Sequence, residues 1–194
     1  MKKKYWIILL IIVFVVVGIF FYKNKVKNLK IGNNKTSQEI VDYILNISSY
    51  EVNVTVNVTS NKNSNKYILK QTYQSPNKST QEVMEPSNIA GVRIENDETS
   101  TKIENSQLDL STILENYNYL GDNCLDLYSF IEEYKKDEKA QFEETDSEIV
   151  MKTNNKTLKV DKKTYNPTQM EIKDNKQKTT IYILYNEVKV NSTK

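Results

Sequence analysis

The stretch YEVNVTVNVTS, residues 50–60, decides the fold class of this chain. Valine occupies the even positions from 52 to 58, and asparagine or threonine occupies the odd positions from 53 to 59. Successive side chains of a β-strand point to opposite faces of a sheet, so this pattern predicts a long strand with one apolar and one polar face. We therefore expect an antiparallel sheet that is covered on one side and meets solvent on the other.

More strands are expected along the rest of the chain, because short runs rich in branched and aromatic residues alternate with polar turns. In the last of them, Ile181 to Tyr185 is apolar on both faces, whereas Val188 and Val190 alternate with charged residues and should point inward. The total is about nine or ten antiparallel strands. Their segments are 66–74, 80–86, 89–95, 101–105, 141–146, 148–154, a hairpin over 157–175, and 179–191.

Two to four helices should cover part of this sheet. Thr36 and Glu39 have the spacing of a capping box, which predicts a helix start at that point. The helix that follows has an apolar stripe at Ile40, Val41, Ile44 and Leu45. Segments 108–123 and 124–139 also show helical spacing, and in the second the expected buried face is Leu127, Phe130, Ile131 and Tyr134.

An uncharged apolar run, residues 5–22, precedes the domain. Eighteen helical residues span roughly 27 Å, close to the thickness of the bilayer core. The run ends in Phe20, Phe21 and Tyr22, which suit a membrane interface and not a signal-peptidase site. We expect a cytosolic tail (1–4), a retained transmembrane anchor (5–22), a basic linker (23–35) and one extracytoplasmic domain (36–194).

The charge distribution argues against nucleic acid as a partner. Residues 1–30 hold seven of the 27 basic side chains and no acid, so residues 31–194 carry 20 basic and 25 acidic side chains, a net charge of −5. An acidic domain of this kind repels phosphate, whereas the basic flanks of the apolar run suit anionic lipid headgroups.

The composition leaves little material for catalysis. The chain has no histidine, which removes histidine-based nucleophile systems and mixed cysteine–histidine zinc sites. Cys124, the only cysteine, is expected to pack as a small apolar side chain. Glu143, Glu144, Asp146 and Glu148 could act as an acid–base pair on glycan or bind calcium, or they form a solvated turn. We expect the turn, and therefore no catalytic residue, no metal site and no cofactor.

The candidate binding surface is an apolar sheet face. Its residues are Val52, Val54, Val56, Val58, Tyr182 and Leu184. In a closed core these side chains only pack, whereas in an open sheet they would line a groove. Tyr117, Tyr119 and Tyr185 have the same two interpretations, since tyrosine combines an apolar ring with a polar tip.

Three stretches resemble the LolA/LolB-like lipoprotein-carrier superfamily: KQTYQSPNKSTQEVMEP (70–86), LKVDKKTYNPTQMEI (158–172) and IYILYNEVKVN (181–191). Within it, the segments 108–135, 142–153 and 170–187 resemble the germination protein GerS family. Two features depart from the family. No lipobox cysteine follows the apolar run, and Tyr165-Asn166 stands where the hairpin usually has glycine, a position at which asparagine would tolerate positive φ.

The resemblance implies a curved antiparallel half-barrel with helices in its concavity. It also implies a non-enzymatic spore protein, in the space between the forespore membranes, that partners a cortex-modifying N-acetylmuramoyl-L-alanine amidase needed for germination. The alternative is a LolA-like carrier of lipid or lipoprotein acyl chains. The open sheet edges of a half-barrel also leave homodimer formation as an expectation.

Overall fold

The computed structural model describes residues 35–76, 78–97, 99–105, 107–115, 125–174 and 178–190. The expected anchor (5–22) lies outside these residues, as do residues 1–4 and 23–34 on either side of it, Tyr117, Tyr119 and Cys124. None of the helices within the described ranges combines the length and the hydropathy that a membrane crossing requires.

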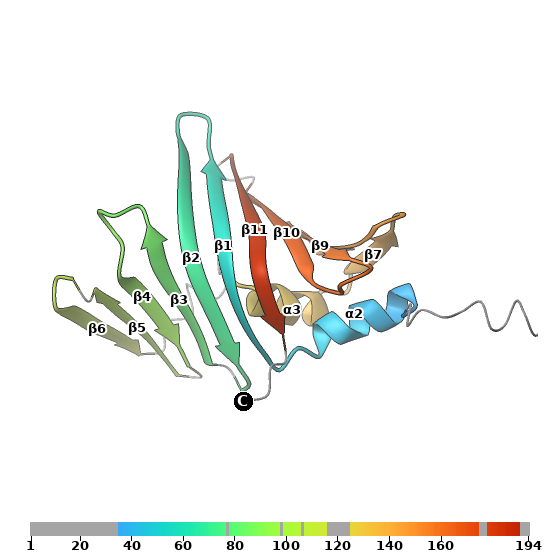
Figure 1. Cartoon of the computed structure of the whole chain (residues 1–194), viewed down its shortest axis with the longest axis horizontal. Helices are drawn as coiled ribbons and strands as arrows, with labels where there is room; N and C mark the ends of the chain where they lie inside the picture. The colour runs from blue at the N-terminus through green and yellow to red at the C-terminus, as the bar shows by residue number, and fades with distance from the viewer. Residues whose placement is uncertain are drawn as a thin grey trace, which may run out of the picture. The chain divides into compact units, whose positions relative to one another are not determined.

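The described residues form one curved antiparallel sheet of eleven strands (Figure 1). The order across the sheet is β6-β5-β4-β3-β2-β1-β11-β10-β9-β8-β7, so the first and last strands are neighbours at its centre. The strands are β1 (Ser49–Thr59), β2 (Ser64–Gln74), β3 (Lys78–Glu85), β4 (Val92–Asn96), β5 (Ser100–Asn105), β6 (Leu110–Glu115), β7 (Gln141–Glu144), β8 (Glu148–Lys152), β9 (Lys156–Asp161), β10 (Pro167–Asp174) and β11 (Thr179–Val190).

The valine alternation of β1 determines which face of the sheet is covered. Val52, Val54 and Val56 are at most 1% exposed, and Val58 packs partly buried against the same core. β1 pairs over its length with both β2 and β11, which extends the buried face to Leu69 on one side and Ile183 on the other. The predicted one-sided strand is confirmed.

Two helices lie on this face, which we call the helix-covered face. In α2 (Ser37–Leu45), Thr36 and Glu39 form the predicted capping box, and Ile40, Val41 and Ile44 are buried. In α3 (Leu127–Lys136), the N-cap is Asp126, and Leu127, Phe130 and Ile131 are buried. The remaining predicted face residues, Leu45 and Tyr134, pack partly buried against the same core.

The core occupies only part of the sheet. Besides the helices and β1, its buried side chains come from β2 and from strands β8 to β11, among them Met151, Leu158, Met170 and Ile183. No apolar residue of β3 to β6 is among the buried hydrophobic residues of the described chain. We call β3 to β6 the outer wing.

A bulge changes the side-chain alternation of β11. Tyr185 points into the core, yet the next inward apolar residue is Val188, three positions later. The register between β1 and β11 shifts at this point, and Glu187 has φ 51. The extra residue returns Val188 and Val190 to the core, which confirms their predicted inward orientation.

The prediction of a helix over 108–123 is wrong for the residues of this segment that the structure describes. Residues 110–115 form β6, which pairs with β5 over six residues. Thr112 and Ile113 are branched at Cβ and favour an extended chain, and cross-strand pairing outweighs a leucine spacing that also fits a helix.

Candidate functional site

The predicted binding residues lie on two different faces. Val52, Val54 and Val56 are core residues, whereas Tyr182 and Leu184 are 38% and 41% exposed. The register explains this separation, because Leu184 pairs with Thr55 and Tyr182 with Asn57, both on the polar side of β1. The structure therefore does not bring the six residues together in one surface.

An apolar groove of about 240 Å³ lies beside Val58 on the helix-covered face. Its walls come from β1 to β4 and from the segment that leads into α3. The lining includes Val58, Tyr67, Leu69, Val83, Ile94 and Leu125. Val83 and Ile94 belong to the outer wing, which contributes no side chain to the buried apolar core. The sequence feature that indicates this groove is the alternation of apolar and polar residues in β1, which continues in the neighbouring strands.

Two glutamines hold the start of α3 beside this groove. The amide of Gln71 donates to the Leu125 carbonyl at 3.2 Å, and the amide of Gln81 donates to Asp126 Oδ2 at 3.3 Å. Asp126 is buried and also accepts from the Ser129 backbone N–H at 2.6 Å. Gln71 is fully buried, and its Oε1 has no hydrogen-bond partner within the described residues. Sequence reasoning missed these glutamines, because nothing in their local pattern marks them as buried.

Three tyrosines pack where α3 meets the sheet. The rings of Tyr73 and Tyr128 stack at 4.2 Å between centroids, and Tyr50 lies 5.6 Å from Tyr73. Burial, with a smaller contribution from nearby Glu132, raises the pKa of Tyr128 to about 12. Burial also raises the pKa of Tyr185, a core residue whose hydroxyl contacts Met170 Sδ at 3.9 Å. The tyrosines in these contacts therefore contribute to the packing of the fold.

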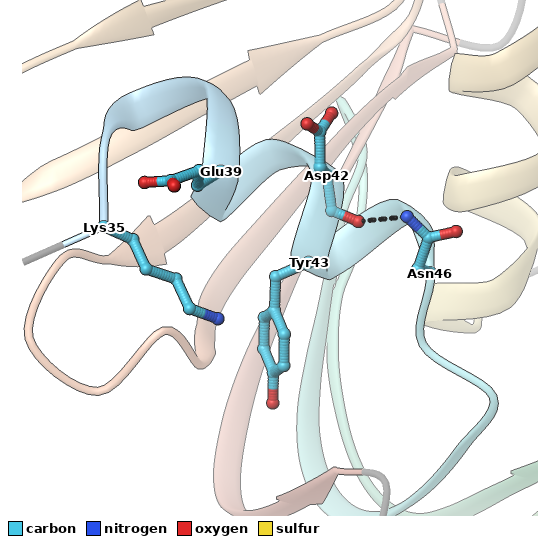
Figure 2. A pocket seen from close by; sticks show the side chains of 5 residues that line it. All are labelled: Lys35, Glu39, Asp42, Tyr43 and Asn46. Atoms are coloured by element: carbon cyan, nitrogen blue, oxygen red, sulfur yellow. Dashed lines mark hydrogen bonds between the residues drawn. The ribbon is translucent and has the colours of Figure 1, made fainter. Parts of the chain in front are cut away.

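A second, open pocket of about 420 Å³ lies against α2 and is lined by polar residues (Figure 2). The Lys35 ammonium lies 4.1 Å from the centre of the Tyr43 ring and 4.8 Å from that of Tyr165. Asn46 donates to the Asp42 backbone carbonyl at 2.7 Å (Figure 2). The aromatic rings are thus occupied by a cation of the chain itself, which favours a structural role for this cluster.

The hairpin between β9 and β10 corrects one expectation. Tyr165, and not Asn166, has the positive φ, at 60°. The Tyr165 hydroxyl accepts from the Lys35 backbone N–H at 3.3 Å, and its ring meets Tyr43 edge-on at 6.3 Å. These contacts offset the backbone cost that a bulky residue has in this conformation.

The acidic stretch 143–148 forms structural contacts. Glu143 pairs with Lys152 at 2.7 Å, and Glu144 bonds both Lys162 and Ser37. The hydrogen bond from Lys162 is the main reason why the pKa of Glu144 is lowered. No group of three potential metal ligands occurs within the described ranges. Glu143 and Glu144 are thus each paired with a lysine of the chain itself.

No protein-family model and no curated protein matches the chain. Among solved structures, an uncharacterized conserved protein from Thermus thermophilus matches with a TM-score of 0.52 and 11% identity, covering 82% of this chain and 90% of the other. That likeness shows a shared fold. A LolA superfamily protein from Nitrosomonas europaea matches with a TM-score of 0.44 and 13% identity, covering 82% of this chain and 96% of the other. A further match is the structure of the CwlD amidase from Clostridioides difficile in complex with the GerS lipoprotein. The TM-score is 0.44 and the identity is 22%, and the match covers 84% of this chain and 97% of the other.

Proposed function

We propose that this chain is a membrane-anchored, non-enzymatic spore protein that binds and activates a cortex-modifying N-acetylmuramoyl-L-alanine amidase. The partner class follows from the sequence segments 108–135, 142–153 and 170–187, which resemble the GerS family. The GerS lipoprotein is known in complex with the CwlD amidase. In this proposal the amidase supplies every catalytic group, in keeping with a chain that contains no histidine.

The filled helix-covered face is the observation that favours protein binding over lipid transport. A carrier needs a cavity for an acyl chain, yet α2 and α3 pack directly onto β1 and β8 to β11. The apolar groove beside Val58 measures about 240 Å³, whereas the larger pocket against α2 is open and lined by polar residues. Small-molecule pockets usually range from about 300 to 1,000 Å³. A groove of this size suits one or two apolar side chains of a protein partner.

The domain would act as a rigid platform. The part of the sheet that one core holds, β1, β2 and β8 to β11, would change shape little on binding, so it can hold a partner in one conformation. The acidic domain would attract a partner with a basic surface and increase the rate of encounter. Residues 5–22 would keep the complex at the membrane, on the side where peptidoglycan lies, between the forespore membranes.

Co-purification tests the proposal. The full chain, solubilised in detergent, is mixed with the amidase encoded in the same genome, and complex formation is measured together with amide-bond cleavage in isolated peptidoglycan. We expect a stable complex and faster cleavage. Absence of a complex, together with unchanged cleavage, would overturn the proposal.

A LolA-like carrier is the second candidate, and the apolar lining of the groove is the observation that favours it. Native mass spectrometry of the full chain released from detergent would show a retained lipid if this function holds. A lipid-free chain that still binds the amidase would exclude it.

A further inference from the structure

The two edges of the sheet differ sharply. β7 has four residues, of which Glu143 and Glu144 form ion pairs with Lys152 and Lys162 on the neighbouring segments. A short, charged edge of this kind discourages pairing with another chain. The opposite edge, β6, is longer, contains no lysine, arginine or proline, and carries its one charged residue, Glu115, at its end.

β6 is also the most exposed apolar strand of the described chain. Leu110 and Ile113 are each 62% exposed, and Leu108, just before the strand, is 64% exposed. Leu110 and Leu114 lie on the helix-covered side, in register with Asn105 and Thr101, whereas Ile113 lies on the other side. Of the described residues, only β5 pairs with β6. Within the described residues its outer backbone groups have no strand partner, so this edge offers a place for a further strand.

The charges at the ends of β6 indicate what kind of strand fits. Asp109 precedes the strand and Glu115 ends it, and both are exposed without an ion pair to any described residue. Between them lie only apolar and hydroxyl side chains. A complementary strand therefore has small apolar or branched residues in its middle and a basic residue at each end.

A second copy of this chain does not meet that requirement. Its own β6 segment, residues 107–115, brings the same two acids and no base, so pairing of two copies would gather four carboxylates at one small contact. The remainder of the domain, with its net negative charge, adds to this repulsion.

We propose that β6 is a docking edge that accepts an extended, basic-ended segment of a partner protein as a twelfth strand. Main-chain hydrogen bonds to β6 would supply the affinity, and contacts with Leu110, Ile113 and Leu114 would set the register. This inference rests on the proposed function only in taking the partner to be a protein. If that partner is the amidase, it attaches at β6 in addition to the groove beside Val58.

The direct test uses a synthetic strand. The peptide KTVTVTK carries a fluorophore, and its binding to the detergent-solubilised full chain is measured by anisotropy, with hydrogen exchange of the β6 amides as the second readout. We expect saturable binding and slower exchange over residues 110–115. The peptide ETVTVTE should bind about tenfold more weakly, because its ends repel Asp109 and Glu115. KTVTVTK methylated on every interior backbone nitrogen should not bind.

A matched pair of variants separates the two edges. Ile113→Lys places a charge on β6 where the side chain is already exposed, and Gln141→Lys places the same charge on β7. Ile113→Lys should weaken peptide binding by at least about tenfold, since an edge lysine blocks strand addition, and Gln141→Lys should leave it unchanged. Equal effects of the two variants, or binding of the methylated peptide, would overturn the proposal.

The outcomes also separate this inference from the proposed function. If the amidase binds the wild-type chain and the Ile113→Lys variant equally, β6 is not its docking edge although the proposed function stands. If the amidase binds neither, the proposed function fails and the peptide still decides the role of β6. A full chain that dimerises, and becomes monomeric on Ile113→Lys, would show that a second copy occupies the edge and would overturn our choice of partner.

Discussion

The Lys156 ammonium lies 2.8 Å from Glu133 Oε2, and the Lys156 side chain is only 1% exposed. Lys156 opens β9 and Glu133 lies on α3, so this ion pair joins the helix to the far half of the sheet. The same ammonium reaches Ser129 Oγ at 3.4 Å. A buried lysine of this kind needs its partners, because an uncompensated charge in the core is costly.

Removal of Glu133 alone should therefore destabilise the fold more than removal of both charges. We expect Glu133→Gln to lower the free energy of unfolding by about 3 kcal/mol, the lower end of the usual range because Glu133 is 29% exposed. The double variant Glu133→Gln, Lys156→Met should recover most of that loss, since methionine fills the site without a charge. Urea unfolding followed by circular dichroism measures both. A double variant as unstable as the single one would contradict the ion-pair explanation.

The bulge in β11 predicts an unusual tolerance of glycine. Glu187 has φ 51, a conformation that costs a residue with a Cβ about 1–2 kcal/mol. Glu187→Gly should therefore leave stability unchanged or raise it by up to about 1 kcal/mol. Lys189→Gly, at an exposed position of the same strand without positive φ, should lower it by about 0.5–1 kcal/mol. Thermal unfolding of the two variants side by side checks the prediction, and equal losses would rule it out.

The groove predicts that two adjacent residues of β3 respond differently. Val83 lines the groove, whereas Met84 is 48% exposed and is not among the residues that line it. Val83→Asp should weaken binding of the amidase by at least about tenfold, because an unpaired carboxylate in an apolar contact must be desolvated. Met84→Asp should bind as the wild type does. Surface-immobilised full chain and soluble amidase give both affinities, and identical losses would place the contact elsewhere.

Tyrosine ionisation predicts a loss of stability in alkali. The pKa of Tyr128 in the folded chain is raised to about 12, so the folded state holds this proton more tightly than the unfolded state, where the pKa is about 10. The resulting stability is fully present below pH 10 and is lost as pH rises from 10 through 12. Tyr128→Phe should show a smaller fall in melting temperature over that interval. NMR titration of labelled tyrosine Cζ gives the pKa directly, and an ordinary value for Tyr128 would refute the explanation.

Some sequence signals worked because they act locally. The capping box at Thr36 and the apolar faces of α2 and α3 depend on residues within two helical turns, and each is present in the structure. The valine alternation in β1 likewise predicted its buried face. The spacing over 108–123 did not suffice, because a short apolar run fits both periods and pairing with β5 decides between them.

Other features depend on the register between distant strands. The sequence alone determined an antiparallel β fold, the start of α2 at its capping box, the inward side of β1 and the absence of histidine chemistry. Only the tertiary structure decided that Tyr182 and Leu184 face away from the valines, that Gln71 and Lys156 are buried, and that β6 is left as an unpaired edge in the described fold. The physical reason is that side-chain period specifies the two faces of a strand, whereas the neighbours that cover each face come from contacts between residues far apart in the chain.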